Sequence, residues 1–265
     1  MKYKNLPILL SSVAIVGPLQ ASTLLLSDNF NDDPNGSAST FNNNLASTQT
    51  GTLATTTYST QGNAWTAQHS NSSRLLVATS NDGNGNGSVS LNNNFAIQAN
   101  GTDEALQITF NIHEVGGYGN TTKWVQFNVG NSQHLDVGNG GVGAGVLFRV
   151  NGEAGALSGG GGIGSPGTWA ADDLVTITLT GSSGFGSAFN GNGSKATISV
   201  GATNFGTFTL AQQTNAYLTF SAFNYGNDEF GLGTFDNLSV TLVPEPAASL
   251  LGGIGALALL RRRRV

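Results

Sequence analysis

Cysteine is absent from this chain of 265 residues. No disulfide can therefore stabilise the protein, and a lipoprotein signal, which requires a cysteine, is excluded. The sequence has 3 histidines and contains neither a G-x-S-x-G elbow nor an H-E-x-x-H metal motif. Because no catalytic constellation appears, we predict that the protein is not an enzyme and that its stability comes from a packed core, a metal or both.

Charge is also scarce, at 9% of residues. Between residues 22 and 242, four cationic side chains stand against fourteen acidic ones, a net charge of −10. Such a surface repels nucleic acid and anionic lipid, so we expect no nucleic-acid partner. The polar residues are mainly Asn, Ser, Thr and Gly, a composition that can indicate disorder. Recurring apolar runs of period two favour a packed sheet protein instead.

The C-terminal residues 243–265 combine three features in order. Pro244, Glu245 and Pro246 precede an uncharged run from Ala247 to Leu260, and an arginine cluster follows, which comprises Arg261, Arg262, Arg263 and Arg264. As a transmembrane helix the run would span about 21 Å against a hydrocarbon core of about 30 Å, which makes it a marginal anchor. The arginines hold its end in the cytoplasm, while the prolines keep Glu245 extended and open to a protease. A short helix in a soluble core is the alternative, but it would have to bury the arginines.

This tail resembles the PEP-CTERM sorting signal of Gram-negative bacteria, which the membrane protease exosortase recognises. The resemblance rests on the Pro-Glu-Pro motif, the apolar run and the arginine cluster. It implies a protein exported through the inner membrane, retained there transiently and processed by an exosortase-type protease. Its destination would be the cell surface or an extracellular exopolysaccharide matrix of the biofilm kind.

The N-terminal residues 1–21 have the pattern of a Sec-type signal peptide. Lys2 and Lys4 form a positive start, Leu6 to Leu19 form an apolar core, and Leu19-Gln20-Ala21 provides a cleavage site after Ala21. We therefore predict a signal peptide over 1–21, an ectodomain over 22–242 and a sorting tail over 243–265. The ectodomain is long enough for one all-β domain or for two small ones.

The ectodomain sequence predicts an antiparallel β-sandwich, because short alternating apolar runs are separated by Gly, Asn and Asp turns. The expected strands are Arg74 to Thr79, Val89 to Ile97, Ala105 to Glu114, Lys123 to Val129, Val146 to Val150, Leu174 to Thr180, Ala196 to Val200, Phe205 to Leu210, Ala216 to Phe223 and Thr234 to Leu242. Leu26 to Phe30 and Gly233 to Val240 resemble the first and last strands of concanavalin-like jelly rolls. That resemblance implies the jelly-roll fold. No amphipathic helix is expected between the two terminal signals.

Two glycine-rich segments are interpreted as loops. Gly138 to Gly167 is assigned to a long connection with one short strand around Phe148, the alternative being the rim of a ligand site. Asp82 to Val89 matches the first eight positions of an EF-hand loop, but Asn93 stands where calcium requires a bidentate glutamate. Asn and Gly at these positions favour a tight hairpin loop instead.

A calcium site is considered at the two ends of the domain. Jelly rolls often bring their first and last strands side by side, which would place an acidic cluster within reach of Asp236. That cluster comprises Asp28, Asn31, Asp32 and Asp33. Calcium takes six to eight oxygen ligands, which these side chains can provide together with backbone carbonyls. The alternative is a solvated acidic turn without a metal.

A glycan-binding face is considered on two strands. Side chains out of phase with the apolar residues combine aromatic rings with amides and hydroxyls; they are Trp124, Gln126, Asn128, Tyr217, Thr219 and Ser221. Rings can stack on sugar C–H faces while polar groups bind sugar hydroxyls. The alternative is that these aromatic residues belong to the core and that the strand faces are inverted.

We therefore expect an exported protein, with a β-sandwich that binds glycans or has a structural role in the matrix. The alternative is a secreted polysaccharide-active enzyme, a glycoside hydrolase or lyase, on the same fold. Such an enzyme needs two carboxyl groups facing each other across a cleft, and the sequence contains no paired acidic motif of the concanavalin-like hydrolases.

Overall fold

A computed structural model describes residues 22–30, 49–62, 64–68, 74–79, 85–96, 104–118, 124–134, 142–158, 162–181, 194–210, 215–224 and 230–244. All of them belong to the unit Ser22–Glu245. The expected signal peptide and the sorting tail from Glu245 onward lie outside the described residues. Within the described part of the chain, no helix is long and apolar enough to cross a membrane.

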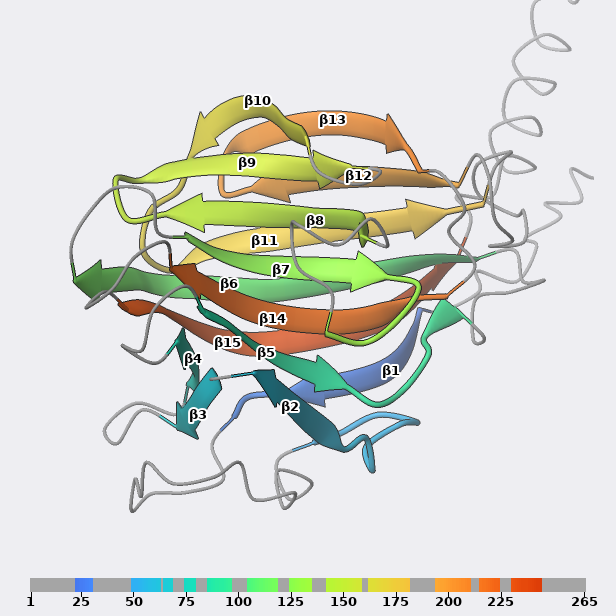
Figure 1. Cartoon of the computed structure of the whole chain (residues 1–265). Helices are drawn as coiled ribbons and strands as arrows, with labels where there is room; N and C mark the ends of the chain where they lie inside the picture. The colour runs from blue at the N-terminus through green and yellow to red at the C-terminus, as the bar shows by residue number, and fades with distance from the viewer. Residues whose placement is uncertain are drawn as a thin grey trace, which may run out of the picture. The chain divides into compact units, whose positions relative to one another are not determined.

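The described residues form two antiparallel sheets, which we call sheet A and sheet B (Figure 1). Sheet A has the order β13 (Thr203–Thr209), β12 (Lys195–Val200), β11 (Asp173–Thr180), β6 (Glu104–Tyr118), β15 (Phe230–Pro244), β4 (Leu75–Thr79) and β3 (Ala64–Gln68), and β1 (Thr23–Asp28) also pairs with β15. Sheet B has the order β10 (Gly162–Thr168), β9 (Glu153–Ser158), β8 (Val142–Arg149), β7 (Trp124–Gly130), β14 (Tyr217–Asn224), β5 (Gly85–Leu91) and β2 (Tyr58–Gly62). The predicted antiparallel β-sandwich is confirmed.

Alternation of apolar and polar residues determines which face of each strand is buried. In β11 the residues Val175, Ile177 and Leu179 are buried, and the threonines between them are half-buried. Successive side chains of a strand point to opposite faces, so each strand contributes one row to the core and one to the outer face. The period-two pattern in the sequence therefore located these strands correctly.

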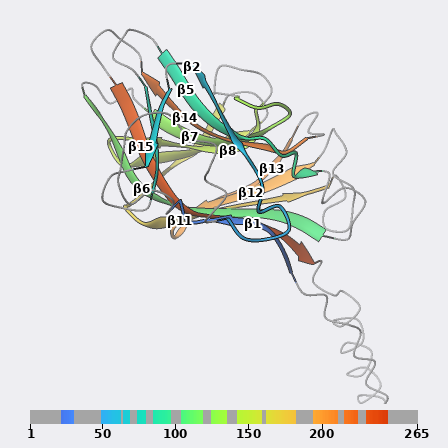
Figure 2. The same ribbon diagram turned by 90° about the horizontal axis from the view of Figure 1, so that it is seen from below.

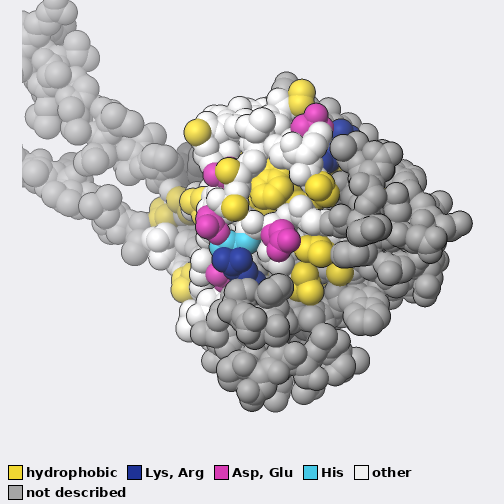
Figure 3. Space-filling view, turned by 90° about the vertical axis from the view of Figure 1, so that its left-hand side faces the viewer, with side chains coloured by type: hydrophobic (Ala, Val, Ile, Leu, Met, Phe, Trp, Pro, Cys, Tyr) yellow, Lys and Arg dark blue, Asp and Glu magenta, His cyan; other side chains and the backbone are white. Residues whose placement is uncertain are grey.

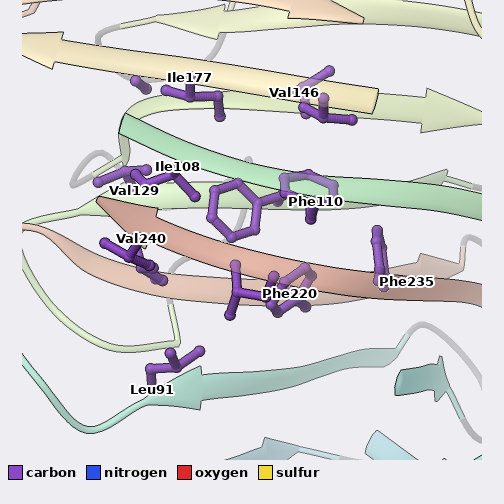
Figure 4. Close-up of a cluster of buried hydrophobic side chains, with 14 of the residues drawn as sticks. Leu91, Ile108, Phe110, Val129, Val146, Ile177, Phe220, Phe235 and Val240 are labelled. Carbon is purple, nitrogen blue, oxygen red and sulfur yellow. The ribbon is translucent and has the colours of Figure 1, made fainter. Parts of the chain in front are cut away.

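The core lies between the two sheets and is dominated by phenylalanine. Phe220 of β14 lies 4.8 Å from Phe127, 4.7 Å from Phe235 and 5.6 Å from Phe110, measured between ring centroids. Figure 4 shows this cluster, and Figure 2 shows β5, β14 and β7 in one layer with β6, β11 and β1 in the other. Rings at such distances contribute about 0.5–1.5 kcal/mol per pair beyond the burial of their surface.

Glycine allows the two sheets to approach closely at one point of the core. A Cβ atom on Gly233 of β15 would lie 2.7 Å from a methyl carbon of Val125 on β7. Any side chain at this position would push the sheets apart, because real Cβ atoms essentially never come so close to another atom.

The expected pairing of the first and last strands is confirmed, since β1 runs antiparallel to β15 with Asp28 opposite Leu238. Each strand expected between Arg74 and Leu242 overlaps an observed one, although β5 begins and ends earlier than expected. The strands β2, β3, β9 and β10 were not predicted.

Two interpretations of glycine-rich segments were wrong. The segment Gly138–Gly167 is not one long connection, because β8, β9 and most of β10 lie within it and form the edge of sheet B. Small residues there belong to the interior, as at Ala144 and Ala156, which are fully buried. The segment Asp82–Val89 is not a hairpin loop, because the strands on its two sides, β4 and β5, belong to different sheets.

Candidate functional site

Polar side chains form two rows on the outer face of sheet B. In one row Ser90, Thr219 and Asn128 lie opposite one another on β5, β14 and β7. The next row also crosses these three strands and comprises Ser88, Ser221 and Gln126. Both rows are out of phase with Val125, Phe127 and Phe220 of the core, so the strand faces are not inverted.

These rows are nevertheless buried. Gln126, Asn128, Thr219 and Ser221 expose 1%, 0%, 1% and 1% of their surface. Gln126 Nε2 donates a hydrogen bond of 2.9 Å to Ser221 Oγ, and Ser90 Oγ lies 3.0 Å from Thr219 Oγ1. Gln126 Oε1 is buried without a hydrogen-bond partner. These four predicted glycan contacts thus lie in a layer beneath the surface.

The aromatic residues of the predicted face are more accessible. Trp124 and Phe223 face each other across β7 and β14, stack with ring centroids 4.6 Å apart and an interplanar angle of 12°, and are both half-buried. Trp124 also packs against a small apolar cluster of Leu147 and Leu157, separate from the main core. Tyr217 is half-buried and lies opposite Gly130.

Arg149 extends the aromatic pair to a third strand, since it lies opposite Trp124 on β8. Arg149 Nη1 is 2.9 Å from Glu153 Oε2, and hydrogen bonds with the side chains of Asn151 and Arg149 lower the pKa of Glu153. Arg149 Nε is buried without a partner. Phe223, Trp124 and Arg149, with Gln126 beside them, thus form a continuous row, which we call the tryptophan row.

The segment after β7 crosses sheet B toward β5 and β2. His134 there has a positive φ of 56°. Its Nε2 lies 2.9 Å from Ser59 Oγ and its Nδ1 2.9 Å from Ser88 Oγ, so the ring connects two strands. Burial lowers the pKa of His134 below its ordinary value, which favours the neutral ring. His134 follows the end of β7 and does not belong to a strand.

The residues of the expected calcium site are only partly described. Asp28 is fully buried, and its carboxylate accepts hydrogen bonds from Phe30 N at 2.8 Å, Gln49 Nε2 at 3.2 Å and Tyr58 Oη at 2.6 Å. Asn31, Asp32 and Asp33 lie outside the described residues. Among the residues that are described, no group of three or more His, Cys, Asp or Glu side chains could hold a metal ion. The Asp28 carboxylate serves the packing of the β1 end.

Asp236 lies beside a histidine of sheet A. His113 of β6 contacts the Asp172 carboxylate through Nδ1, and its Nε2 lies 3.6 Å from Asp236 Oδ2. Arg74 lies 4.0 Å from Asp172. Burial raises the pKa of Asp236, while Asn237, His113 and Arg74 partly oppose that effect. Figure 3 shows a histidine at this surface among acidic side chains and an arginine or lysine.

The sorting motif begins at the end of the described domain. Pro244 is the last residue of β15 and is half-buried. The remaining motif residues, from Glu245 to the arginine cluster, lie outside the described residues, so their predicted roles stay predictions.

No family model matches the chain, and no curated protein matches it. Similar solved structures include peanut lectin with a bound peptide, at a TM-score of 0.46 and 16% identity, covering 85% of this chain and 100% of that one. Lectin II from Ulex europaeus has a TM-score of 0.43 and 12% identity, covering 70% of this chain and 92% of that one. A legume lectin-like domain from Entamoeba histolytica has a TM-score of 0.40 and 10% identity, covering 68% of this chain and 87% of that one. These similarities concern the arrangement of the strands alone.

Proposed function

We propose that the protein is an exported surface or matrix component whose β-sandwich binds a neutral polysaccharide at the tryptophan row of sheet B. The observation that carries this proposal is the stacked, half-buried pair of Trp124 and Phe223 beside Gln126 Oε1, a buried acceptor without a partner. Aromatic surface next to a few fixed polar groups is the usual composition of a small-molecule site.

The chemistry of the row suits a sugar ring. An indole edge and face offer apolar surface to pyranose C–H groups, and the Arg149–Glu153 pair offers a donor and an acceptor to hydroxyls. The stacked pair is fixed before binding, so the ligand orders few side chains, which favours affinity.

Charge selects the class of polysaccharide. The ectodomain carries a net charge of −10 over residues 22–242, so an anionic polymer is repelled and a neutral one is not. We therefore propose a neutral glycan as ligand and the exopolysaccharide matrix as the setting, with the exosortase-type protease as the processing partner.

The end of the sandwich supports processing at the tail. β15 pairs with β6 up to Pro244, opposite Glu104, so the last strand is complete where the motif begins. Cleavage beyond this point would remove the tail and leave the described ladder intact. The protein would then leave the inner membrane as a folded domain.

Binding is tested by retention on particles of an insoluble neutral β-glucan, with alginate beads as the anionic comparison. Trp124→Leu, which keeps apolar volume against Leu147 and Leu157, should lower retention on the neutral glucan at least tenfold. The matched control is Phe208→Leu, which truncates a half-buried aromatic residue of β13 on sheet A that packs against the main core. Equal retention of the wild type and Trp124→Leu on every polymer would reject the site.

Sorting is tested separately by replacing Pro244, Glu245 and Pro246 with alanine. The variant should be exported but remain in the inner-membrane fraction, whereas the wild type reaches the surface. Normal release of the variant would remove the exosortase-type protease from the proposal without affecting glycan binding.

A further inference from the structure

His113 stands at an irregularity of sheet A. On β15 the consecutive residues Thr234 and Phe235 pair with Glu114 and Ile112 of β6, so His113 is the extra residue of a β-bulge. Bulges redirect side chains and are frequent beside functional sites. The bulge adds His113 to the outer face of sheet A, where the neighbouring strands bring Asp236 and the turn residue Asp172 to it.

The two nitrogens of the His113 ring have different environments. Nδ1 contacts the Asp172 carboxylate, which can only accept a hydrogen bond when ionised, so the ring proton is held on Nδ1. Nε2 then presents a lone pair. The side chain of His113 is only 9% exposed, and Nε2 is buried without a hydrogen-bond partner.

Asp236 faces this lone pair at a distance too long for a hydrogen bond. Its Oδ2 lies 3.6 Å from Nε2, so two acceptors confront each other across the gap. A zinc ion about 2.1 Å from both atoms would make an N–Zn–O angle of about 118°, between the tetrahedral and trigonal values.

We propose that His113 Nε2 and Asp236 Oδ2 bind a divalent transition-metal ion, with zinc as the preferred one, on the outer face of sheet A. Asp172 is a positioning residue, because a carboxylate on the distal nitrogen fixes the tautomer and orientation of a ligating imidazole. Water would complete the coordination from the side of Asp236, whose side chain keeps 18% of its surface exposed. Imidazole nitrogen suits zinc, copper or nickel, whereas calcium prefers oxygen, so calcium should not compete.

The test is a Zn²⁺ titration of the full chain by calorimetry, repeated with Co²⁺, whose visible d–d bands report ligation directly. The wild type should bind one ion at this site. His113→Gln should weaken binding on the order of a hundredfold or more and abolish the cobalt bands, and Asp236→Asn should weaken it at least tenfold. Asp172→Asn should weaken binding by about 10–100-fold, the usual effect of removing an outer partner of a ligating histidine.

His134→Asn is the matched control, since this histidine lies on sheet B and both its nitrogens contact serines. It should leave the zinc affinity and the cobalt bands unchanged. Cobalt bands that persist in His113→Gln, or a wild type that binds zinc no more tightly than His113→Gln, would overturn the proposal. The second result would mean that no metal ion binds between His113 Nε2 and Asp236 Oδ2. Circular dichroism of each variant separates loss of the site from loss of the fold.

Discussion

The outer faces of the two sheets contain the same kinds of residue, but these residues differ in their exposure to solvent. On sheet A, rows of hydroxyls and amides cross β15, β6, β11, β12 and β13 at the surface; one comprises Thr241, Gln107, Thr178, Thr197 and Thr207, and the next comprises Ser239, Thr109, Thr176, Ser199 and Asn204. All of these are half-buried or exposed. The equivalent rows on sheet B, which contain Thr219 and Gln126, are buried.

The two faces therefore differ in how far their polar groups are exposed to water. Hydroxyls on sheet A provide solubility to a chain with few charges, and exposed hydrogen bonds such as the 2.8 Å contact between Thr197 and Thr207 add little stability. On sheet B the polar groups are withdrawn from water and must be paired within the protein, where each lost partner has a larger cost. The tryptophan row, where we propose that the glycan binds, lies at the border of this buried layer.

The largest expected effect tests whether both faces rest on a single core. Phe220→Ala on β14 removes a ring that contacts Phe110, Phe127 and Phe235 from both sheets. We expect a loss of about 3–5 kcal/mol in the free energy of unfolding. Urea unfolding followed by circular dichroism and by tryptophan fluorescence should give one coincident transition. Two separated transitions would mean that the sheets are stabilised independently.

Thr219→Val should have the next largest effect. The substitution keeps the shape but removes the hydroxyl that lies 3.0 Å from Ser90 Oγ in the buried layer. We expect a loss of about 1 kcal/mol in unfolding free energy, because Ser90 retains its bond to Leu218 O. Val at the same position of the outer row cannot create a cavity, so a loss above about 3 kcal/mol would contradict this account of the pair.

The sequence predicts which side chains leave the core but not which of them reach solvent. Alternation in Leu174 to Thr180 and in Lys123 to Val129 identified the inner rows correctly. The burial of Gln126 and Thr219 depends on what lies over sheet B, which no local pattern records. The polar residues of these strands therefore led us to predict an accessible glycan-binding face. In the structure the same polar residues form a buried layer.

Two further features that the sequence did not predict are the role of Gly145 and the contacts made at the β-bulge of His113. A Cβ on Gly145 of β8 would lie 2.4 Å from the carbonyl oxygen of Phe127, so this glycine serves close strand approach and not a loop. His113 of β6 is contacted by residues of β15 and of the turn before β11, which are distant in sequence. Only the register, with its extra residue, brings them together.

The stability of the protein should depend on pH through His134 on sheet B. This effect should be smaller than that of Thr219→Val, because His134 is partly exposed. Burial lowers its pKa in the folded state, so protonation disfavours folding. Its stabilising contribution is fully present above the ordinary pKa of about 6.5 and is lost as the pH falls from there through the folded-state value. Melting curves of the wild type and of His134→Asn, which tolerates positive φ, should therefore converge on acidification. Parallel curves would assign the pH dependence elsewhere, for example to Asp236.

The smallest effect is expected at Thr178→Val on sheet A, the counterpart of Thr219→Val. Thr178 lies between Gln107 and Thr197 on the outer face and is half-buried, so water replaces any partner that its hydroxyl loses. Valine also has a high strand preference and fits the same pleated surface. We expect a change within about 0.5 kcal/mol of unfolding free energy. A loss here equal to that of Thr219→Val, measured by urea unfolding under the same conditions, would show that sheet A is also covered in solution and that the two outer faces do not differ.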